Sequence, residues 1–313
     1  MSHDSPRIAV LLPCYNEAAA IAAVVRDFKT ALPNAAIYVF DNNSTDNTVE
    51  VARQAGARVF SEKHQGKGYV VRRMFADIEA DVYVLADGDG TYHAPASAPM
   101  VEQLLKDHLD MVVGVRQSRP EDQTYRLGHA FGNRLFTRIV SVLFGNDFTD
   151  ILSGYRVMSR RFVKSFPANT RGFEIETQLT IHALELVLPC AEYDTPYAAR
   201  PEGSVSKLNT YRDGAKILLA ITVLFKETRP LAFFGLLALL CACVSVGLGV
   251  PVVIEYLHTG LVPRFPTAIL ASGVGLMALI FVIAGITLDT VSRNHRELKR
   301  LFYVSHAASG VRR

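Results

Sequence analysis

The sequence predicts an α/β protein: a mostly parallel sheet with helices on both faces, followed by a two-helix transmembrane hairpin. Short apolar runs alternate with helical patterns between Arg7 and Val115. Apolar strands separated by helices are typical of parallel sheets that are covered on both faces. Further along the chain, Leu231–Ile254 and Phe265–Leu288 each run for 24 residues without a charged side chain.

The expected strands are residues 7–13, 35–40, 57–62, 81–86 and 110–115, and helical patterns occupy residues 17–32, 46–56 and 66–78. In sheets of this kind, ligands bind at the carboxyl ends of the strands. The residues directly after each strand are therefore the candidate site.

Those residues are polar after each of the first four strands: "PCYNE", "DNNSTDN", "KHQGKG" and "DGDGTY". The chain has no GxGxxG after the first strand and no GxxxxGK[ST], so a dinucleotide site of the usual type and a phosphate-loop ATPase are disfavoured. Asp87 and Asp89 follow the fourth strand, separated by one glycine. One such pair alone fits a solvated turn, but its place among three other polar strand ends favours a Mg²⁺ or Mn²⁺ site with a nucleotide.

The charge is unevenly distributed along the chain. Met1 to Ser206 has 21 Lys and Arg against 25 Asp and Glu, whereas Lys207 to Arg313 has 12 against 5. Basic charge beside apolar sequence favours a lipid bilayer as partner and disfavours nucleic acid.

Each uncharged stretch would form a helix about 36 Å long, enough for a hydrocarbon core of about 30 Å. Two buried core helices are the alternative, but these stretches lack the polar stripe of such helices. Basic residues flank the pair: Lys216, Lys226 and Arg229 before it, and Arg293, Arg296, Lys299 and Arg300 after it. The connecting loop has only Arg264. The positive-inside rule therefore predicts a multi-pass protein of the cytoplasmic membrane, with the catalytic domain and both termini in the cytoplasm.

Two further features agree with that location. No leader is expected in Met1–Arg7, and the four cysteines form no metal-ligand pattern, as expected in a reducing cytosol. The predicted parts are a catalytic domain (1–211), an interfacial amphipathic helix (212–230), a hairpin (231–288) and a basic cytoplasmic tail (289–313).

Five segments in order, "PCYNE", "DNNSTDNT", "ADGDGTY", "DILSGYRV" and "GSVSKL", resemble motifs of inverting glycosyltransferases with the Rossmann-like GT-A fold. Together with the hairpin, they resemble dolichol-phosphate mannose synthase and bacterial polyprenyl-phosphate glycosyltransferases. The resemblance covers about Ile8 to Tyr211 by motif and the remainder by architecture.

This resemblance implies roles for the strand-end residues. The nucleoside pocket would contain Pro13, Tyr15, Asn16 and Glu17, and Asp41 and Asn42 would contact the nucleobase. Asn42 stands where many relatives have a second aspartate. Asp87 would meet the ribose or the metal and Asp89 would be the principal metal ligand, with Thr91 as a third metal contact.

A lipid phosphate acceptor needs no general base, because its second pKa near 6 leaves it largely ionised at neutral pH. Such an acceptor instead needs cations that hold it beside the anionic donor. Arg116 follows the fifth strand and is expected at the donor diphosphate, together with Lys207, which the resemblance places on a closing loop. The expected acceptor-phosphate contacts are Arg126, His129, Arg134 and Arg156, whereas Arg119 and Arg138 fit solvated helix faces.

The roles of three acidic residues stay open at this point. Asp150 could orient the acceptor phosphate or a sugar hydroxyl, or cap the next element. Glu174 and Glu176 fit either a structural role or contact with sugar hydroxyls.

The predicted function is transfer of a hexose or N-acetylhexosamine, with inversion, from a UDP- or GDP-linked donor to undecaprenyl or dolichyl phosphate. The alternatives are another membrane-associated acceptor, such as a glycolipid or polysaccharide hydroxyl, and a non-catalytic scaffold that binds nucleotide-sugar. A processive polysaccharide synthase is disfavoured because the Gln-x-x-Arg-Trp motif is impossible in a chain without tryptophan. A sugar-phosphate nucleotidyltransferase is disfavoured because it would not need a membrane anchor. Whether the protein forms a homo-oligomer is left open.

Overall fold

The computed structural model describes residues 5–117, 148–168, 175–198, 219, 222–223 and 225–306. The contacts divide the chain into two units. The first contains Met1–Ala220 together with Lys299–Arg313, and the second contains Ile221–Leu298.

Within the described residues, the first unit contains one seven-stranded sheet in the order β3-β2-β1-β4-β6-β5-β7. The strands are β1 (Ile8–Cys14), β2 (Ala36–Asp41), β3 (Arg58–Ser61), β4 (Val82–Leu85), β5 (Met111–Gln117), β6 (Arg156–Ser159) and β7 (Cys190–Pro196). Strands β1 to β4 pair in parallel, as do β5 and β7, whereas β6 runs antiparallel to both of its neighbours. The predicted α/β fold with a mostly parallel sheet is confirmed.

Strands β6 and β7 were not expected from the sequence. β6 has four residues and follows a Ser-Gly turn directly, so it gives little pattern of its own. β7 carries Glu192, Asp194 and Pro196 and lies at the edge of the sheet, where a strand needs no continuous apolar run. Pairing with β5 fixes its register.

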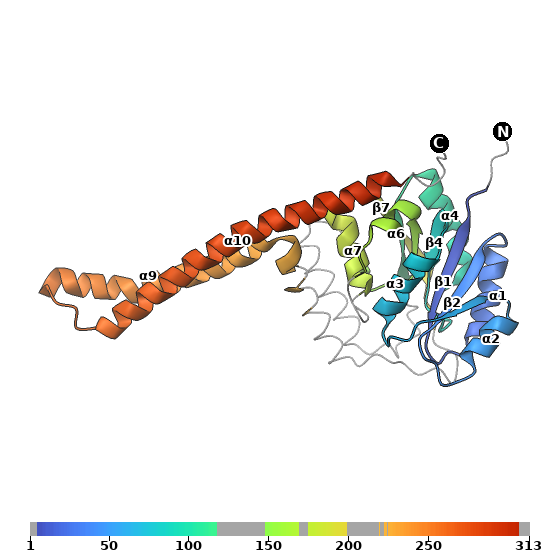
Figure 1. Ribbon diagram of the computed structural model, residues 1–313, viewed down its shortest axis with the longest axis horizontal. Helices are drawn as coiled ribbons and strands as arrows, with labels where there is room; N and C mark the ends of the chain where they lie inside the picture. The colour runs from blue at the N-terminus through green and yellow to red at the C-terminus, as the bar shows by residue number, and fades with distance from the viewer. Residues whose placement is uncertain are drawn as a thin grey trace. The chain divides into compact units, whose positions relative to one another are not determined.

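Helices cover both faces of the sheet (Figure 1). They are α1 (Ile21–Ala31), α2 (Thr48–Gln54), α3 (Lys67–Asp77), the 3₁₀ turn η1 (Ala94–Ala96), α4 (Ser97–Lys106), α6 (Arg160–Ser165) and α7 (Ile175–Glu185). Val10 and Leu12 of β1 join the core formed with α1. On the other face, Phe75 of α3 meets Tyr83 of β4, with ring centroids 6.3 Å apart.

The second unit is formed by α9 (Pro230–Thr259) and by α10 (Phe265–Ser305) up to Leu298. The two helices lie side by side (Figure 1), and Ser245 Oγ donates to the carbonyl of Ala271 at 2.7 Å. Both are long and apolar enough to cross a membrane by length and composition, and they contain the two predicted spans.

Within the predicted basic tail (289–313), α10 continues as far as Ser305. Its last turns belong to the first unit. There, Tyr303 Oη donates to Asp110 Oδ2 at 2.7 Å, and Lys299 Nζ lies 2.7 Å from Glu185 Oε2. Most of the predicted interfacial helix, 212–230, lies outside the described residues and stays a prediction.

His182 of α7 is buried beside α6 and provides a pH-dependent contribution to stability. Its side chain contacts Phe162 and Phe166, and Nε2 lies 3.1 Å from Ser165 Oγ. Burial, together with the charge of Lys299, lowers the pKa of His182 to about 3. The folded state therefore holds the neutral imidazole, which must be protonated on unfolding in mild acid.

We predict that His182→Gln flattens the dependence of unfolding free energy on pH. The folded pKa lies below the unfolded one, so this contribution is present above about pH 6.5 and is lost as the pH falls towards 3, by at most about 1.4 kcal/mol per unit. Denaturant unfolding of the detergent-solubilised protein at pH 7 and pH 5 measures the slope. The exposed control His93→Gln should keep the parental slope, and a His182→Gln slope equal to it would contradict the prediction.

Candidate functional site

The strand register brings three of the polar segments to one edge of the sheet. Cys14 of β1 is opposite Asp41 of β2, and Asp41 is opposite Ser61 of β3. β4 pairs with β1 up to Leu85, just before Asp87. The segments that follow β1, β2 and β4 therefore lie together, as the sequence predicts.

The segments after β1 and β2 hold one another by hydrogen bonds. Thr45 N donates to Asn16 Oδ1 at 2.7 Å, and Asn16 N donates to Ser44 Oγ at 2.9 Å. Glu17 N donates to Thr48 Oγ1 at 2.8 Å, and the Asp41 carboxylate accepts from Ser44 N. Glu17 and Asp41 are buried, while Pro13 and Tyr15 are half-buried. Four of the predicted nucleoside-pocket residues and Asp41 are thus placed side by side.

The side chain of Asn42 is bonded within the protein, whereas the sequence predicted that it contacts the nucleobase. Its Nδ2 donates to the carbonyls of Glu62 and His64 at 2.9 and 2.8 Å, and its Oδ1 accepts from Gly66 N at 2.7 Å. The amide is fully used inside the protein. An aspartate could not make the two donor bonds, so Asn42 fastens the segment between β3 and α3.

The two aspartates after β4 lie on one tight turn. Asp89 is buried, and its Oδ1 accepts from Thr91 N at 3.1 Å and Thr91 Oγ1 at 2.7 Å. Gly88, between the aspartates, is required by close approach: a Cβ there would lie 2.3 Å from Cys14 Sγ. The turn therefore lies directly against β1, and Thr91 orients Asp89.

The donor set of this turn suits a hard divalent cation with a nucleotide. Mg²⁺ is usually bound by one or two carboxylates, with substrate phosphates and water completing its oxygen shell. Asp87 and Asp89 supply two such carboxylates. Among the described residues no group of three His, Cys, Asp or Glu could hold a metal, so an all-protein cage is not formed by that part of the chain.

Asp87 already has an internal cation beside it. Lys67 Nζ lies 2.5 Å from Asp87 Oδ1 and 2.5 Å from Glu176 Oε1. The side chain of Lys67 is 9% exposed, that of Glu176 6% and that of Asp87 29%. Burial lowers the pKa of Lys67, but the two carboxylates outweigh this and raise that pKa above its ordinary value.

Lys67 was not among the site residues predicted from the sequence. One signal was available: Lys67 is the first residue of α3, where the helix dipole disfavours a cation. Gly154 also contributes to this cluster. A Cβ at Gly154 would lie 3.0 Å from Lys67 Nζ and 3.1 Å from Asp87 Oδ2, and Gly154 N donates to Tyr92 Oη at 2.8 Å.

A second ion pair joins Arg116, which was predicted at the donor diphosphate, and Asp150, whose predicted role was left open between an acceptor or sugar contact and a cap. Arg116 Nε and Nη2 donate to the two oxygens of Asp150 at 2.7 and 2.8 Å. Arg116 Cζ also lies 5.7 Å from the centroid of the Tyr197 ring. Burial lowers the pKa of Arg116, but the bonds to Asp150 raise it overall. The Arg116 guanidinium therefore stays charged beside Asp150.

The prediction that Arg156 contacts the acceptor phosphate is wrong. It is fully buried in β6, and its guanidinium donates to the carbonyls of Ser153 and Ile151 and to Thr180 Oγ1 at 3.0, 2.9 and 2.9 Å. All these contacts are within the core. Burial lowers the pKa of Arg156 from its usual value.

The remaining predicted site residues lie outside the described part of the chain: Arg126, His129, Arg134 and Lys207, together with Glu174. Their roles stay predictions.

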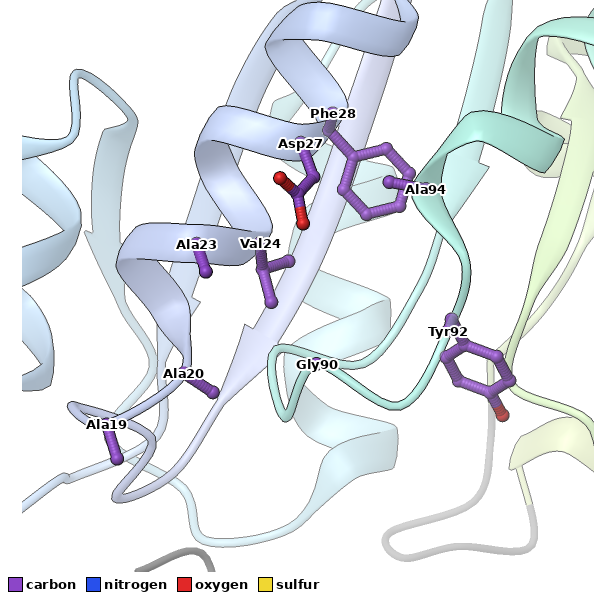
Figure 2. A pocket seen from close by; sticks show the side chains of 9 residues that line it. All are labelled: Ala19, Ala20, Ala23, Val24, Asp27, Phe28, Gly90, Tyr92 and Ala94. Atoms are coloured by element: carbon purple, nitrogen blue, oxygen red, sulfur yellow. The ribbon is translucent and has the colours of Figure 1, made fainter. Parts of the chain in front are cut away.

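A cavity of about 230 Å³ lies beside the aspartate turn, between α1 and the segment Gly90–Ala94 (Figure 2). Four of its nine lining residues are alanines, Asp27 is the charged residue among the nine, and Tyr92 lies at one end. Asp87, Asp89 and Lys67 do not line it. The cavity is therefore adjacent to the charged site but separate from it.

We predict that Arg116→Met destabilises the protein by about 3–5 kcal/mol, because it removes the cation from a buried carboxylate. The double variant Arg116→Met/Asp150→Asn should recover much of that loss. Denaturant unfolding of both variants gives the coupling energy. As a control, Arg73→Met breaks the exposed pair with Asp77 and should cost about 0.5 kcal/mol or less. A double variant no more stable than Arg116→Met would contradict the pairing argument.

Comparison with known proteins identifies the family. The model of glycosyl transferase family 2 matches residues 9–166. Glycosyltransferase AglJ of Haloferax volcanii is 34% identical over 300 residues, which are 94% of this chain and 97% of the relative. A dolichyl-phosphate hexose transferase of the same organism is 31% identical over 222 residues, 71% of this chain and 95% of the relative.

Solved structures share the fold. The glucosyl-3-phosphoglycerate synthase of Mycobacterium tuberculosis, crystallised with Mn²⁺, uridine diphosphate and phosphoglyceric acid, superimposes with a TM-score of 0.59 at 22% identity. The superposition covers 71% of this chain and 79% of that one. The predicted GT-A fold is confirmed, and the chain belongs to glycosyl transferase family 2.

Proposed function

We propose that this glycosyltransferase moves a sugar, with inversion, from a nucleotide-sugar to a polyprenyl phosphate at the cytoplasmic membrane. The main support is that one chain joins a family 2 catalytic fold to two helices long and apolar enough to cross a bilayer. Such an anchor keeps the enzyme where a lipid acceptor is found. The similarity to a dolichyl-phosphate hexose transferase points to the same acceptor class.

The donor site is proposed at the edge formed by the segments after β1, β2 and β4. Pro13, Tyr15, Asn16, Glu17 and Asp41 line the nucleoside side of this edge. Asp87 and Asp89 would hold Mg²⁺ or Mn²⁺, which would stabilise the negative charge that develops on the departing diphosphate. Thr91 orients Asp89 through the two hydrogen bonds described above.

The arrangement of carboxylates agrees with an acceptor that needs no proton removed. Asp87 and Glu176 share Lys67, and Asp150 is held by Arg116 at both oxygens. Asp150, which accepts two charge-assisted bonds, is therefore poorly suited to take a proton from a hydroxyl. A lipid phosphate, already ionised at neutral pH, requires no such base.

Acceptor binding is assigned to Arg126, His129 and Arg134 on the sequence, with Lys207 at the donor diphosphate. Both long ends of the hairpin are assigned to the cytoplasm on the distribution of basic residues.

The acceptor is tested with detergent-solubilised protein, undecaprenyl phosphate, Mn²⁺ and a panel of labelled UDP- and GDP-sugars. We expect one donor to yield a labelled lipid whose sugar is attached through the phosphate with inverted anomeric configuration, established by phosphorus and proton NMR. Equal transfer to a glycolipid or polysaccharide hydroxyl would reject the lipid-phosphate proposal and favour another membrane acceptor.

We predict that Asp89→Asn lowers turnover on the order of 100-fold, because metal stabilisation of the leaving group is worth several kcal/mol. Asparagine retains the acceptor oxygen for Thr91, so the fold should stay intact, as thermal unfolding will show. EDTA should abolish the parental activity and Mn²⁺ should restore it. Asp27→Ala, an exposed acidic residue of the neighbouring cavity, is the matched control and should keep full activity. Full activity of Asp89→Asn would exclude the metal role of this turn.

A further inference from the structure

The Lys67 cluster combines three groups from three segments of the chain. Lys67 is at the start of α3, Asp87 follows β4, and Glu176 is in the first turn of α7. One ammonium and two carboxylates carry a net charge of −1 when all are ionised. Among the described residues of this cluster, with Asp89 on the same turn as Asp87, Lys67 is one cation against three carboxylates.

This position is unfavourable for a lysine unless its charge is used. The side chain is almost completely buried and stands at the positive end of a helix dipole. Glu176 is also incompletely satisfied: within the described part of the chain, its Oε2 is buried and has no hydrogen-bond partner. Burial raises the pKa of Glu176, and Lys67 opposes that rise. The cluster is therefore held together by charge.

The geometry limits how Asp87 can meet a ligand. Lys67 Nζ pairs with Oδ1, and a Cβ at position 154 would lie 3.1 Å from Oδ2, so Gly154 leaves room for the carboxylate on that side. A divalent cation at the aspartate turn would meet an Asp87 whose charge is partly neutralised by a lysine that Glu176 also holds. Lys67 thus weakens the attraction of these carboxylates for a cation that arrives alone, whereas a nucleotide diphosphate adds negative charge that favours cation binding.

We propose that Lys67 is an internal counter-ion of the donor site, a positioning residue that fixes Asp87 and keeps divalent-cation binding weak until a nucleotide diphosphate is present. Glu176 holds Lys67 in place. This inference rests on the proposed metal-dependent donor site, and it adds an order to binding: the cation enters with the nucleotide.

The test measures free Mn²⁺ by electron paramagnetic resonance in titrations of the full-length protein in detergent, without nucleotide. Lys67→Met should bind Mn²⁺ about tenfold or more tightly than the parent, because a buried like charge is removed. Lys67→Arg keeps the charge and should stay within about threefold of the parent. Glu176→Gln removes a negative charge and should weaken Mn²⁺ binding, the opposite sign. Lys63→Met, an exposed lysine four residues away, is the control and should change little.

A second readout separates positioning from simple destabilisation. Added UDP or GDP should tighten Mn²⁺ binding strongly in the parent and much less in Lys67→Met. Turnover of Lys67→Met should fall despite its tighter metal binding, because Asp87 is no longer fixed. If Lys67→Met fails to fold, the Mn²⁺ affinity of Glu176→Gln decides. Weaker Mn²⁺ binding by Glu176→Gln, with Lys67→Arg close to the parent, supports the counter-ion role. Tighter Mn²⁺ binding by Glu176→Gln overturns it.

Mn²⁺ binding that Lys67→Met leaves unchanged or weakens, in a folded protein, overturns the counter-ion role alone. Absence of Mn²⁺ binding by the parent with either nucleotide overturns that role and the proposed metal dependence together. Neither titration contains a lipid acceptor, so the acceptor proposal is judged separately.

Discussion

The Lys67 bridge between Asp87 and Glu176 is the interaction on which the organisation of the site depends. It joins the start of α3, the end of β4 and the first turn of α7 through a single buried ammonium. Three segments that are far apart in sequence are held at the edge of the sheet where the aspartate turn lies. Without the lysine, two carboxylates would face one another in a poorly solvated place, at a high cost in free energy.

Arg116 and Asp150 form a similar ion pair between distant segments of the chain. A cation from the end of β5 meets a carboxylate from the segment before β6, in a bidentate pair. Asp87 and Asp150 are thus fixed in direction before any substrate arrives. Because carboxylates repel a diphosphate, they would act through a bound divalent cation, which would stabilise the departing diphosphate. Asn42 and Thr91 complete the arrangement by fixing a backbone segment and Asp89, respectively.

Much of the fold could be predicted because β1 to β5 are apolar runs with helices between them, and because parallel strands gather their carboxyl ends. The sequence did not reveal β6 and β7, which form through tertiary pairing in spite of short or charged sequences. It also misplaced Arg156, since an arginine after a turn looks like a phosphate ligand, and only the fold shows its bonds to core carbonyls. Lys67 was missed because its two partners lie 20 and 109 residues further along the chain, a proximity that no local pattern encodes.

The most direct measurement is the coupling between Mn²⁺ and nucleotide in the unaltered protein, by isothermal titration calorimetry. Mn²⁺ is titrated with and without saturating UDP or GDP, and each nucleotide is titrated with and without Mn²⁺. The account predicts that one nucleotide and Mn²⁺ each tighten the binding of the other by more than about tenfold, by equal factors, since coupling free energy is reciprocal. Mn²⁺ binding of the same affinity with and without nucleotide would contradict it.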